Sequence, residues 1–199
     1  MTNVDLFIFD TRKYTTSVLV DLLKLSKEDV LPFDKFQSEE IKKEKIISFY
    51  YKKNYVKDWY LSKDGKPLSH NLFFNISHSK GIVAFAFNED YPIGVDIELI
   101  RPVEESLKQY ISSENELKYM ENEENFFEIW TNKESLVKCI GQGIKGQPKN
   151  INALPLNGIR IVDNKTYNSK ILKWNNCVIS LTLETENDYQ IKVHKGTLI

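Results

Sequence analysis

The sequence predicts an α+β protein in which helices pack on antiparallel sheet. Short apolar runs of strand length follow one another between turn-forming residues, and segments with helical spacing stand before and after them. We find no low-complexity segment and no repeat at the level of residues. The order and type of these elements therefore predict the α+β class.

The first elements are a strand and two helices. Residues 4–9 are a short apolar run and predict a strand. Residues 15–25 carry apolar side chains at helical spacing. Ser38 can cap a further helix that extends to about Val56, because acidic residues follow it in the first turn, where the helix dipole favours them.

A group of three strands follows. A turn is expected at residues 64–67, which read Asp-Gly-Lys-Pro. Residues 72–76 and 82–87 predict two strands joined by the polar segment 77–81, and residues 93–99 predict a third.

The second half begins with helices. Ser113 and Glu116 form a capping-box pattern. Residues 126–140 have the apolar spacing of a helix, and the glycines of 141–143 are typical of its end. Strand-like runs at 178–183 and 189–193 complete the α+β pattern.

Composition limits the classes of function. The 199 residues are 41% hydrophobic, which suffices for one sizeable core or two small packed halves. The net charge of −1 indicates no general affinity for nucleic acid or an anionic membrane, and no apolar run approaches the roughly 18 residues that span a bilayer. The N-terminus lacks a signal-peptide pattern. Cys139 and Cys177 lack metal-ligand spacing, so we expect a reduced, cytoplasmic protein.

Charge is uneven along the chain. Residues 35–66 contain nine lysines and five acidic residues, whereas residues 104–128 contain eight glutamates and two lysines. Runs of this kind are usually solvated helix faces. The basic run would also suit an anionic ligand or an acidic partner protein.

The motif Gly94-Val95-Asp96-Ile97-Glu98 places two acids in an apolar strand. Residues two apart in a strand point to the same face, so both carboxylates can converge on one cation. An exposed sheet face with ordinary acids is the alternative interpretation.

Two further motifs carry polar groups. In Trp130-Thr131-Asn132-Lys133-Glu134-Ser135-Leu136-Val137-Lys138, Glu134 and Lys138 share a helix face, as a simple stabilising pair also would. In Asn75-Ile76-Ser77-His78-Ser79, a histidine and hydroxyl groups follow an apolar strand and can donate to a phosphate.

Taken in order, these motifs resemble the 4′-phosphopantetheinyl transferase superfamily, and its monomeric, surfactin-synthetase-activating type in particular. Between residue 65 and about residue 143 they read GKP, FNISHS, GVDIE and WTNKESLVK. The resemblance implies a pseudo-dimer of two similar halves, each an antiparallel sheet packed with helices. We place these halves at residues 1–93 and 94–199, and we expect a monomer.

The resemblance also implies an activity. Such an enzyme transfers the phosphopantetheine arm of coenzyme A to a serine of an apo acyl or peptidyl carrier protein and releases adenosine 3′,5′-bisphosphate. Asp96, Glu98 and Glu134 match the family's ligands for Mg²⁺, and Mn²⁺ would suit the same oxygen atoms. Glu134 is the first candidate for the base that takes the serine proton, with Asp96 the second. Lys138 matches a lysine that contacts the pyrophosphate.

The remaining positions that match concern coenzyme A. Ile76, Ser77 and His78 match positions that line the coenzyme, with His78 on a phosphate, and Lys66 matches another coenzyme-binding lysine. The coenzyme-binding set also includes Asp96, Glu134 and Lys138. Before GKP the family has an arginine where this chain has lysines, which are point charges rather than planar donors. Lys43 is the residue we expect at the 3′-phosphate or adenine.

Two other functions stay open at this point. The chain could be a non-catalytic module of the same fold that binds coenzyme A or a carrier protein. It could also be a metal-dependent phosphodiesterase, although such hydrolases usually have clustered histidines and this chain has three in all. Carrier proteins of this system are acidic, so the basic run at residues 35–66 could steer one to the enzyme.

Overall fold

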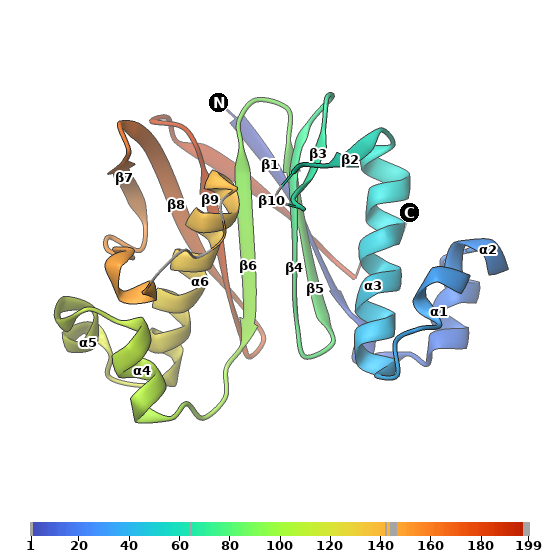
Figure 1. Cartoon of the computed structure of the whole chain (residues 1–199), viewed down its shortest axis with the longest axis horizontal. Coiled ribbons are helices and arrows are strands. Elements are labelled where there is room, and N and C mark those ends of the chain that lie inside the picture. The colour runs from blue at the N-terminus through green and yellow to red at the C-terminus, as the bar shows by residue number, and fades with distance from the viewer. Residues whose placement is uncertain (1, 64, 142, 144–146, 197–199) are drawn as a thin grey trace.

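Two four-stranded sheets occupy the centre of the molecule, and two long helices lie on them (Figure 1). The computed structural model describes residues 2–63, 65–141, 143 and 147–196. The two sheets and a short hairpin of β2 (Trp59–Leu61) and β3 (Pro67–Ser69) contain seven strand pairs in all, and six of these pairs are antiparallel. Helices cover the sheets, so the predicted α+β class is confirmed.

The first sheet has the strand order β10-β1-β5-β4. Its strands are β1 (Thr2–Asp10), β4 (Phe73–Ser79), β5 (Ile82–Asn88) and β10 (Tyr189–Lys195). A two-residue turn joins β4 to β5, and Lys80 and Gly81 both have the positive φ that such hairpin turns need. The expected polar connection over residues 77–81 is therefore wrong for residues 77–79, which continue the strand.

The second sheet is antiparallel throughout, with the order β6-β9-β8-β7. Its strands are β6 (Ile93–Leu99), β7 (Gly158–Val162), β8 (Lys165–Trp174) and β9 (Cys177–Leu183). The strands expected at 93–99 and 178–183 are confirmed as β6 and β9, whereas the sequence did not indicate β7 and β8.

Each sheet carries one long helix. Helix α3 (Glu39–Tyr51) begins at the predicted cap, Ser38, and continues as a π-helical turn (Lys52–Val56). Helix α6 (Glu123–Ile140) begins at Asn122 and ends at Gly141, whose φ of +86° is the left-handed conformation that glycine adopts easily. Both predicted helices are thus confirmed, while Gln142 lies outside the described residues.

The shorter elements surround these helices. The capping box of Ser113 and Glu116 is present at the start of α5, as predicted. The expected turn at 64–67 includes Asp64, which lies outside the described residues. The short elements are η1 (Thr11–Lys13), α1 (Thr16–Leu22), α2 (Lys27–Val30), η2 (Leu31–Phe33), β2 (Trp59–Leu61), β3 (Pro67–Ser69), α4 (Glu105–Ile111), α5 (Glu114–Tyr119) and η4 (Pro148–Asn150).

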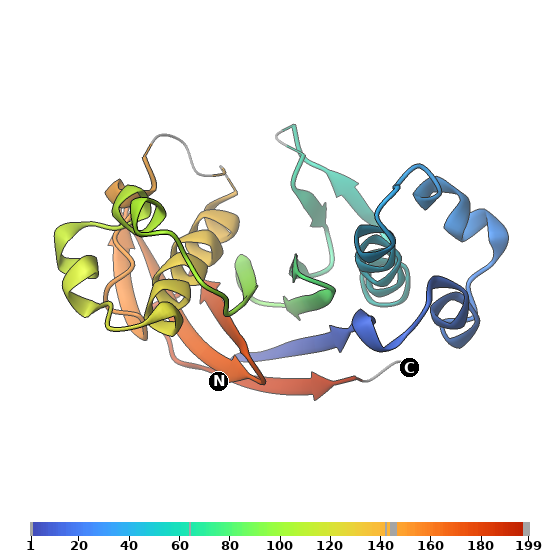
Figure 2. The same ribbon diagram turned by 90° about the horizontal axis from the view of Figure 1, so that it is seen from below.

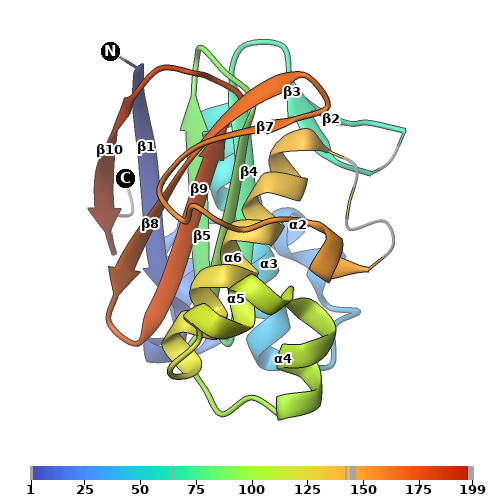
Figure 3. The same cartoon turned by 90° about the vertical axis from the view of Figure 1, so that its left-hand side faces the viewer.

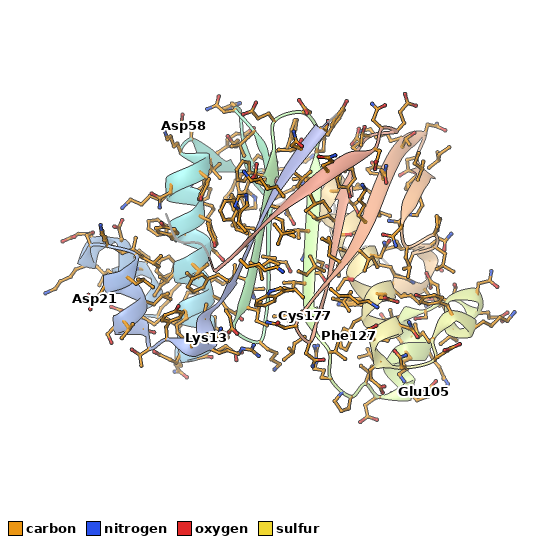
Figure 4. The ribbon with its side chains drawn as sticks, turned by 180° about the vertical axis from the view of Figure 1, so that it is seen from behind. Lys13, Asp21, Asp58, Glu105, Phe127 and Cys177 are labelled. Carbon is orange, nitrogen blue, oxygen red and sulfur yellow. The ribbon has the colours of Figure 1, made fainter. Side chains whose placement is uncertain are left out.

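One apolar core joins the two sheets. It contains buried residues of β1, β5, β6 and β9, and Cys177 lies within it, near the middle of the molecule (Figure 4). A second, aromatic core fills the space between the first sheet and α3. The two cysteines are unpaired and buried.

The C-terminal strand crosses between the halves. β10 pairs in parallel with β1, and these two strands run together along the side of the molecule away from α3 and α6 (Figure 2). Seen from one end, strands β1, β8 and β10 form one side and helices α4–α6 lie toward the other (Figure 3). A cut between residues 93 and 94 therefore leaves one strand of the first sheet in the second segment. Within the described residues, no helix has the length and apolar character to cross a membrane.

Candidate active site

Strand β6 positions the two acids of the GVDIE motif. Val95 and Ile97 are fully buried in the core between the sheets, as the alternating pattern predicts. Asp96 is 4% exposed and Glu98 is half-buried. Both acids thus point away from the apolar core, toward strand β4, but remain largely shielded from solvent.

Side chains of β4, rather than its backbone, connect the two sheets at this point. Three polar residues on one face of β4 accept hydrogen bonds from the backbone N–H groups of β6: Asn75 from Val95 at 3.0 Å, Ser77 from Ile97 at 3.4 Å, and Ser79 from Leu99 at 3.4 Å. Both hydroxyl groups also donate, that of Ser77 to Asp96 at 2.7 Å and that of Ser79 to Glu98 at 2.6 Å. This side-chain ladder gives the alternating polar residues of FNISHS a structural role.

Helix α6 brings Glu134 and Lys138 to the same place. Gly94 permits a very close approach of β6, because a Cβ there would lie 1.9 Å from the carbonyl oxygen of Ser135. The Nζ of Lys138 donates to Oδ1 of Asp96 at 2.6 Å and to Ser77 at 3.1 Å. Lys138 of the helix is therefore in direct contact with Asp96 of the strand.

Electrostatics also link the three acids. Burial raises the pKa of Glu134, the negative charge of Asp96 raises it further, and Lys138 opposes the shift, while Glu98 adds to it. Burial likewise raises the pKa of Asp96 against the opposing effect of Lys138. We call Asp96, Glu98, Glu134 and Lys138 the acidic cluster.

The acidic cluster contains a fully buried acceptor without a partner among the described residues. Oδ2 of Asp96 is buried and has no hydrogen-bond partner among the described residues. Glu98 uses one oxygen, Oε2, for both Ser79 and Arg101, the latter at 2.9 Å. No group of three His, Cys, Asp or Glu side chains in the described ranges is arranged to hold a metal ion as it stands. The donor set and the unpartnered buried oxygen nevertheless fit Mg²⁺, which prefers carboxylate ligands and keeps several water molecules.

A cleft of about 370 Å³ adjoins the acidic cluster. Glu134 and Lys138 line it from α6, and Lys66 and Pro67 line it from the GKP motif. Lys66 is not free there: its Nζ donates to the carbonyl oxygens of Lys138 at 2.6 Å and Cys139 at 3.2 Å. The ammonium thus lies at the C-terminal end of α6, where the helix dipole favours a cation, and burial lowers its pKa.

His78 lies on the other face of β4 from Ser77. Its Nδ1 is 3.0 Å from Oε2 of Glu44, and its Nε2 is 3.1 Å from Nζ of Lys45. We call His78, Glu44 and Lys45 the histidine group. Sequence reasoning placed neither Glu44 nor Lys45 at the coenzyme, although they stand one and two residues after Lys43, the lysine that it chose.

The structure does not bring Lys43 to this group. Its Nζ donates to the backbone oxygens of Thr11 at 3.2 Å and Tyr14 at 2.9 Å. Residues two apart on a helix point in different directions, which is why Lys45 faces His78 and Lys43 does not. Ile76 packs on the aromatic core below α3, and Ser77 contacts the acidic cluster.

Lys133 of the WTNKE motif has a structural role. It is completely buried, and its Nζ donates to Oε2 of Glu116 at 2.7 Å and to the carbonyl oxygens of Ile111 and Pro148. Burial lowers the pKa of Lys133, against the opposing effect of Glu116. This lysine joins α6 to α4, α5 and η4.

The basic run at residues 35–66 is less positive in space than in sequence. Lys42 is paired with Asp34 at 2.7 Å, and Lys53 with Asp29 at 2.7 Å. The ammonium group of Lys52 lies 3.9 Å from the centre of the Trp59 ring. Lys45 is the lysine of this run that stands beside His78.

Comparison with known proteins agrees with the motifs. The profile of the 4′-phosphopantetheinyl transferase superfamily matches residues 92–194. The 4′-phosphopantetheinyl transferase gsp of Aneurinibacillus migulanus is 34% identical over 109 residues, which cover 51% of this chain and 42% of gsp. The enzymes named ffp and Sfp from Bacillus subtilis are 40% and 35% identical over 89 residues, which cover 40% of this chain and 39% of each relative. The matched part is thus about two-fifths of the length of these relatives.

Proposed function

The chain belongs to the 4′-phosphopantetheinyl transferase superfamily, and on that premise we propose that it transfers the 4′-phosphopantetheine group of coenzyme A to a serine of an apo carrier protein, releasing adenosine 3′,5′-bisphosphate. The observation that carries the proposal is the acidic cluster. Glu134 and Lys138 line one cleft, and Lys138 contacts Asp96, whose Oδ2 is buried and has no hydrogen-bond partner among the described residues.

Asp96, Glu98 and Glu134 are the residues that would hold Mg²⁺ or Mn²⁺. A divalent ion bound there would supply positive charge against the pyrophosphate. This assignment explains why the strand keeps Asp96 in the interior, where burial disfavours its ionised form even with Lys138 beside it.

The chain's own residues would then have distinct tasks. The carrier serine attacks the phosphorus that bears the pantetheine arm, and its proton passes to the carboxylate of Glu134, which faces the cleft. The bond between that phosphorus and the bridging oxygen breaks, and the electron pair leaves with adenosine 3′,5′-bisphosphate. Lys138, beside Asp96, is placed to stabilise charge on the pyrophosphate oxygens.

The partner in this reaction would be a small acidic carrier protein. Because aspartates already pair with Lys42 and Lys53, and Lys45 lies beside His78, we assign the steering role mainly to Lys52. Reversing the charge at Lys52 should slow modification and flatten its dependence on salt, whereas reversal at Lys42 or Lys53 should have less effect.

Mass spectrometry of a carrier protein tests the proposal. The protein is mixed with MgCl₂, coenzyme A and an apo acyl or peptidyl carrier protein, and the carrier should gain the mass of one phosphopantetheine group. Asp96→Ala and Glu134→Ala should abolish this gain, and Glu114→Ala, which changes an exposed acid of α5, should not.

Two results would contradict the proposal. If the protein binds coenzyme A but modifies no carrier from any class, it is a binding module rather than a transferase. If it removes the arm from a holo carrier instead, it is a phosphodiesterase.

A further inference from the structure

We propose that Glu44 is a positioning residue that orients His78 toward a phosphate, and that it thereby sets a preference for coenzymes that carry a 3′-phosphate. The inference rests on the proposed function, because it assumes that the anion bound near His78 belongs to coenzyme A. It concerns a residue to which the sequence motifs give no role.

Glu44 is a buried acid with two fixed partners. It is 3% exposed, and its Oε1 accepts a hydrogen bond from the backbone N–H of Gly81 at 2.7 Å. Its Oε2 lies 3.0 Å from Nδ1 of His78. One carboxylate thus joins α3 to His78 near the end of β4 and to Gly81 in the hairpin turn that follows. These two contacts leave Glu44 little freedom to move.

These contacts fix the orientation of the imidazole ring. An ionised carboxylate can only accept, so Nδ1 of His78 carries the proton that the pair shares. Nε2 then points away from Glu44, toward Nζ of Lys45 at 3.1 Å. His78 is the exposed member of the pair, with a side chain 35% accessible, so Nε2 and the ammonium group form one accessible polar end.

The histidine group is separate from the acidic cluster. Ser77 and His78 are successive residues of β4 and point to opposite faces, Ser77 to Asp96 and His78 to Glu44. An anionic group that contacts Lys138 and one that contacts His78 must therefore be two different groups. If the pyrophosphate of coenzyme A lies at the acidic cluster, the remaining phosphate of the molecule, on the ribose 3′ position, is the one that fits His78 and Lys45.

The carboxylate of Glu44 also favours the positively charged form of His78 that a phosphate ligand requires. When a phosphate arrives, His78 can donate from Nε2 only if the ring keeps its proton on Nδ1 and takes up a second one. Glu44 stabilises the resulting imidazolium, and Lys45 adds a second cation on the side of the ligand.

Calorimetric titration with coenzyme A and 3′-dephospho-coenzyme A tests this inference. Wild-type protein should bind coenzyme A more tightly than the dephospho form. Glu44→Gln keeps the acceptor for Gly81 but turns an amide N–H toward Nδ1, and should reduce that preference about tenfold while leaving the dephospho form unaffected. Glu40→Gln, which removes an exposed charge from the same helix, should leave both affinities unchanged.

Two additional variants separate positioning from general stability. His78→Ala should lose the same preference, and adding Glu44→Gln to it should cause no further loss, because the two residues act as one unit. Glu44→Asp keeps the charge but is one methylene shorter, and should also lose the preference. It serves as the second variant if Glu44→Gln does not fold. Nitrogen NMR of His78 should show a proton on Nδ1 in the wild type and on Nε2 in Glu44→Gln.

The outcomes are distinct. A wild-type preference that survives in both Glu44 variants, or that survives in His78→Ala, contradicts the inference, and so does a wild-type protein that binds neither coenzyme. A protein that shows the expected binding pattern but transfers no arm contradicts the proposed function and leaves the role of Glu44 standing.

Discussion

Asp96 illustrates the conflict between stability and function at the scale of a single residue. Burial raises its pKa, which means that the folded protein favours the neutral form more than the unfolded chain does. The ionised form therefore costs stability at neutral pH, even with Lys138 and Ser77 as partners. Retaining this acid makes sense if its free oxygen has a ligand during function.

Asp96→Asn should thus lower activity without lowering stability. The amide oxygen can still accept from Lys138 and Ser77, and the buried negative charge is gone. We expect transfer to fall by about 10²-fold or more, while the melting temperature at pH 7 stays equal or rises. A large drop in melting temperature would show that the charge stabilises the fold and would contradict this explanation.

Glu44 behaves in the opposite way. Burial raises its pKa, but hydrogen bonds from His78 and Gly81 outweigh this effect, so its pKa in the folded protein is below the ordinary value. A depressed carboxyl pKa contributes stability above the unfolded pKa, and that stability is lost as the pH falls through the folded pKa.

We therefore predict that the cost of Glu44→Gln depends on pH. Wild-type protein should be more stable than the variant by about 1–3 kcal/mol at pH 7, and the difference should shrink below about pH 4.5. Urea unfolding at pH 7, 5, 4 and 3 measures it, with Glu40→Gln as the control. A difference that grows as the pH falls would contradict the prediction.

Part of the candidate site could be predicted at this scale. A period of two in a strand places Asp96 and Glu98 on one face, and a period of four in a helix does the same for Glu134 and Lys138. The resemblance to the superfamily, rather than the spacing, indicated that the two pairs belong to one site. The contact of His78 with Glu44 and Lys45 could not be predicted, because these two residues lie more than 30 positions before His78 and meet it through the packing of α3 on β4. Lys43 and Lys45 are indistinguishable in sequence, and the rotation of the helix decides between them.

At the scale of elements, the polar end of β4 shows why its boundary was missed. Asn75, Ser77 and Ser79 have a loop-like composition, but each faces the N–H groups of β6 and keeps the strand regular. Strands β7 and β8 were missed for a related reason. Their segments, GIRIV and KTYNSKILKW, mix exposed and buried residues without a clear apolar run.

The contact between β6 and α6 should be intolerant of any side chain at residue 94. In Gly94→Ala the new Cβ would lie 1.9 Å from the Ser135 carbonyl oxygen and 2.5 Å from the Cys139 nitrogen, so the helix that carries Glu134 must move. We expect a loss of about 3 kcal/mol or more in the free energy of unfolding, together with loss of transfer.

Gly65→Ala is the matched comparison. Apart from its chain neighbours, no described residue has an atom within 4 Å of a Cβ at residue 65, and the φ of +79° is what opposes the change. That strain should cost about 1–2 kcal/mol. Equal losses in the two variants, measured by chemical unfolding, would contradict the packing argument for Gly94.

At the scale of the whole molecule, β10 holds the two halves together. It follows the second sheet in sequence but pairs with β1 of the first, and Tyr189 at its start is completely buried. Local patterns correctly indicate the strand itself. They cannot indicate its partner, because a pairing between residues almost 190 positions apart leaves no periodic signal.

Removal of residues 189–199 should consequently destabilise the entire protein. β1 would lose its parallel neighbour and the core would lose Tyr189, so we expect the melting temperature to fall by about 10 °C or more. His194→Ala removes the contacts of one side chain, namely the pairing with Asp5 and the stacking on the Phe7 ring, and should lower the melting temperature less than the truncation does. A truncated protein that melts like the full chain would show that β10 is dispensable.

The central claim is that carboxylates from β6 and α6 act on one divalent ion beside the pyrophosphate of coenzyme A. A crystal structure with coenzyme A and Mn²⁺, recorded with anomalous scattering from the metal, tests it most directly. We predict one anomalous peak bound by Asp96, Glu98 and Glu134 and by pyrophosphate oxygens, with Lys138 turned from Asp96 toward the phosphates. Coenzyme A bound elsewhere, or carboxylates that point apart with no metal between them, would contradict the claim.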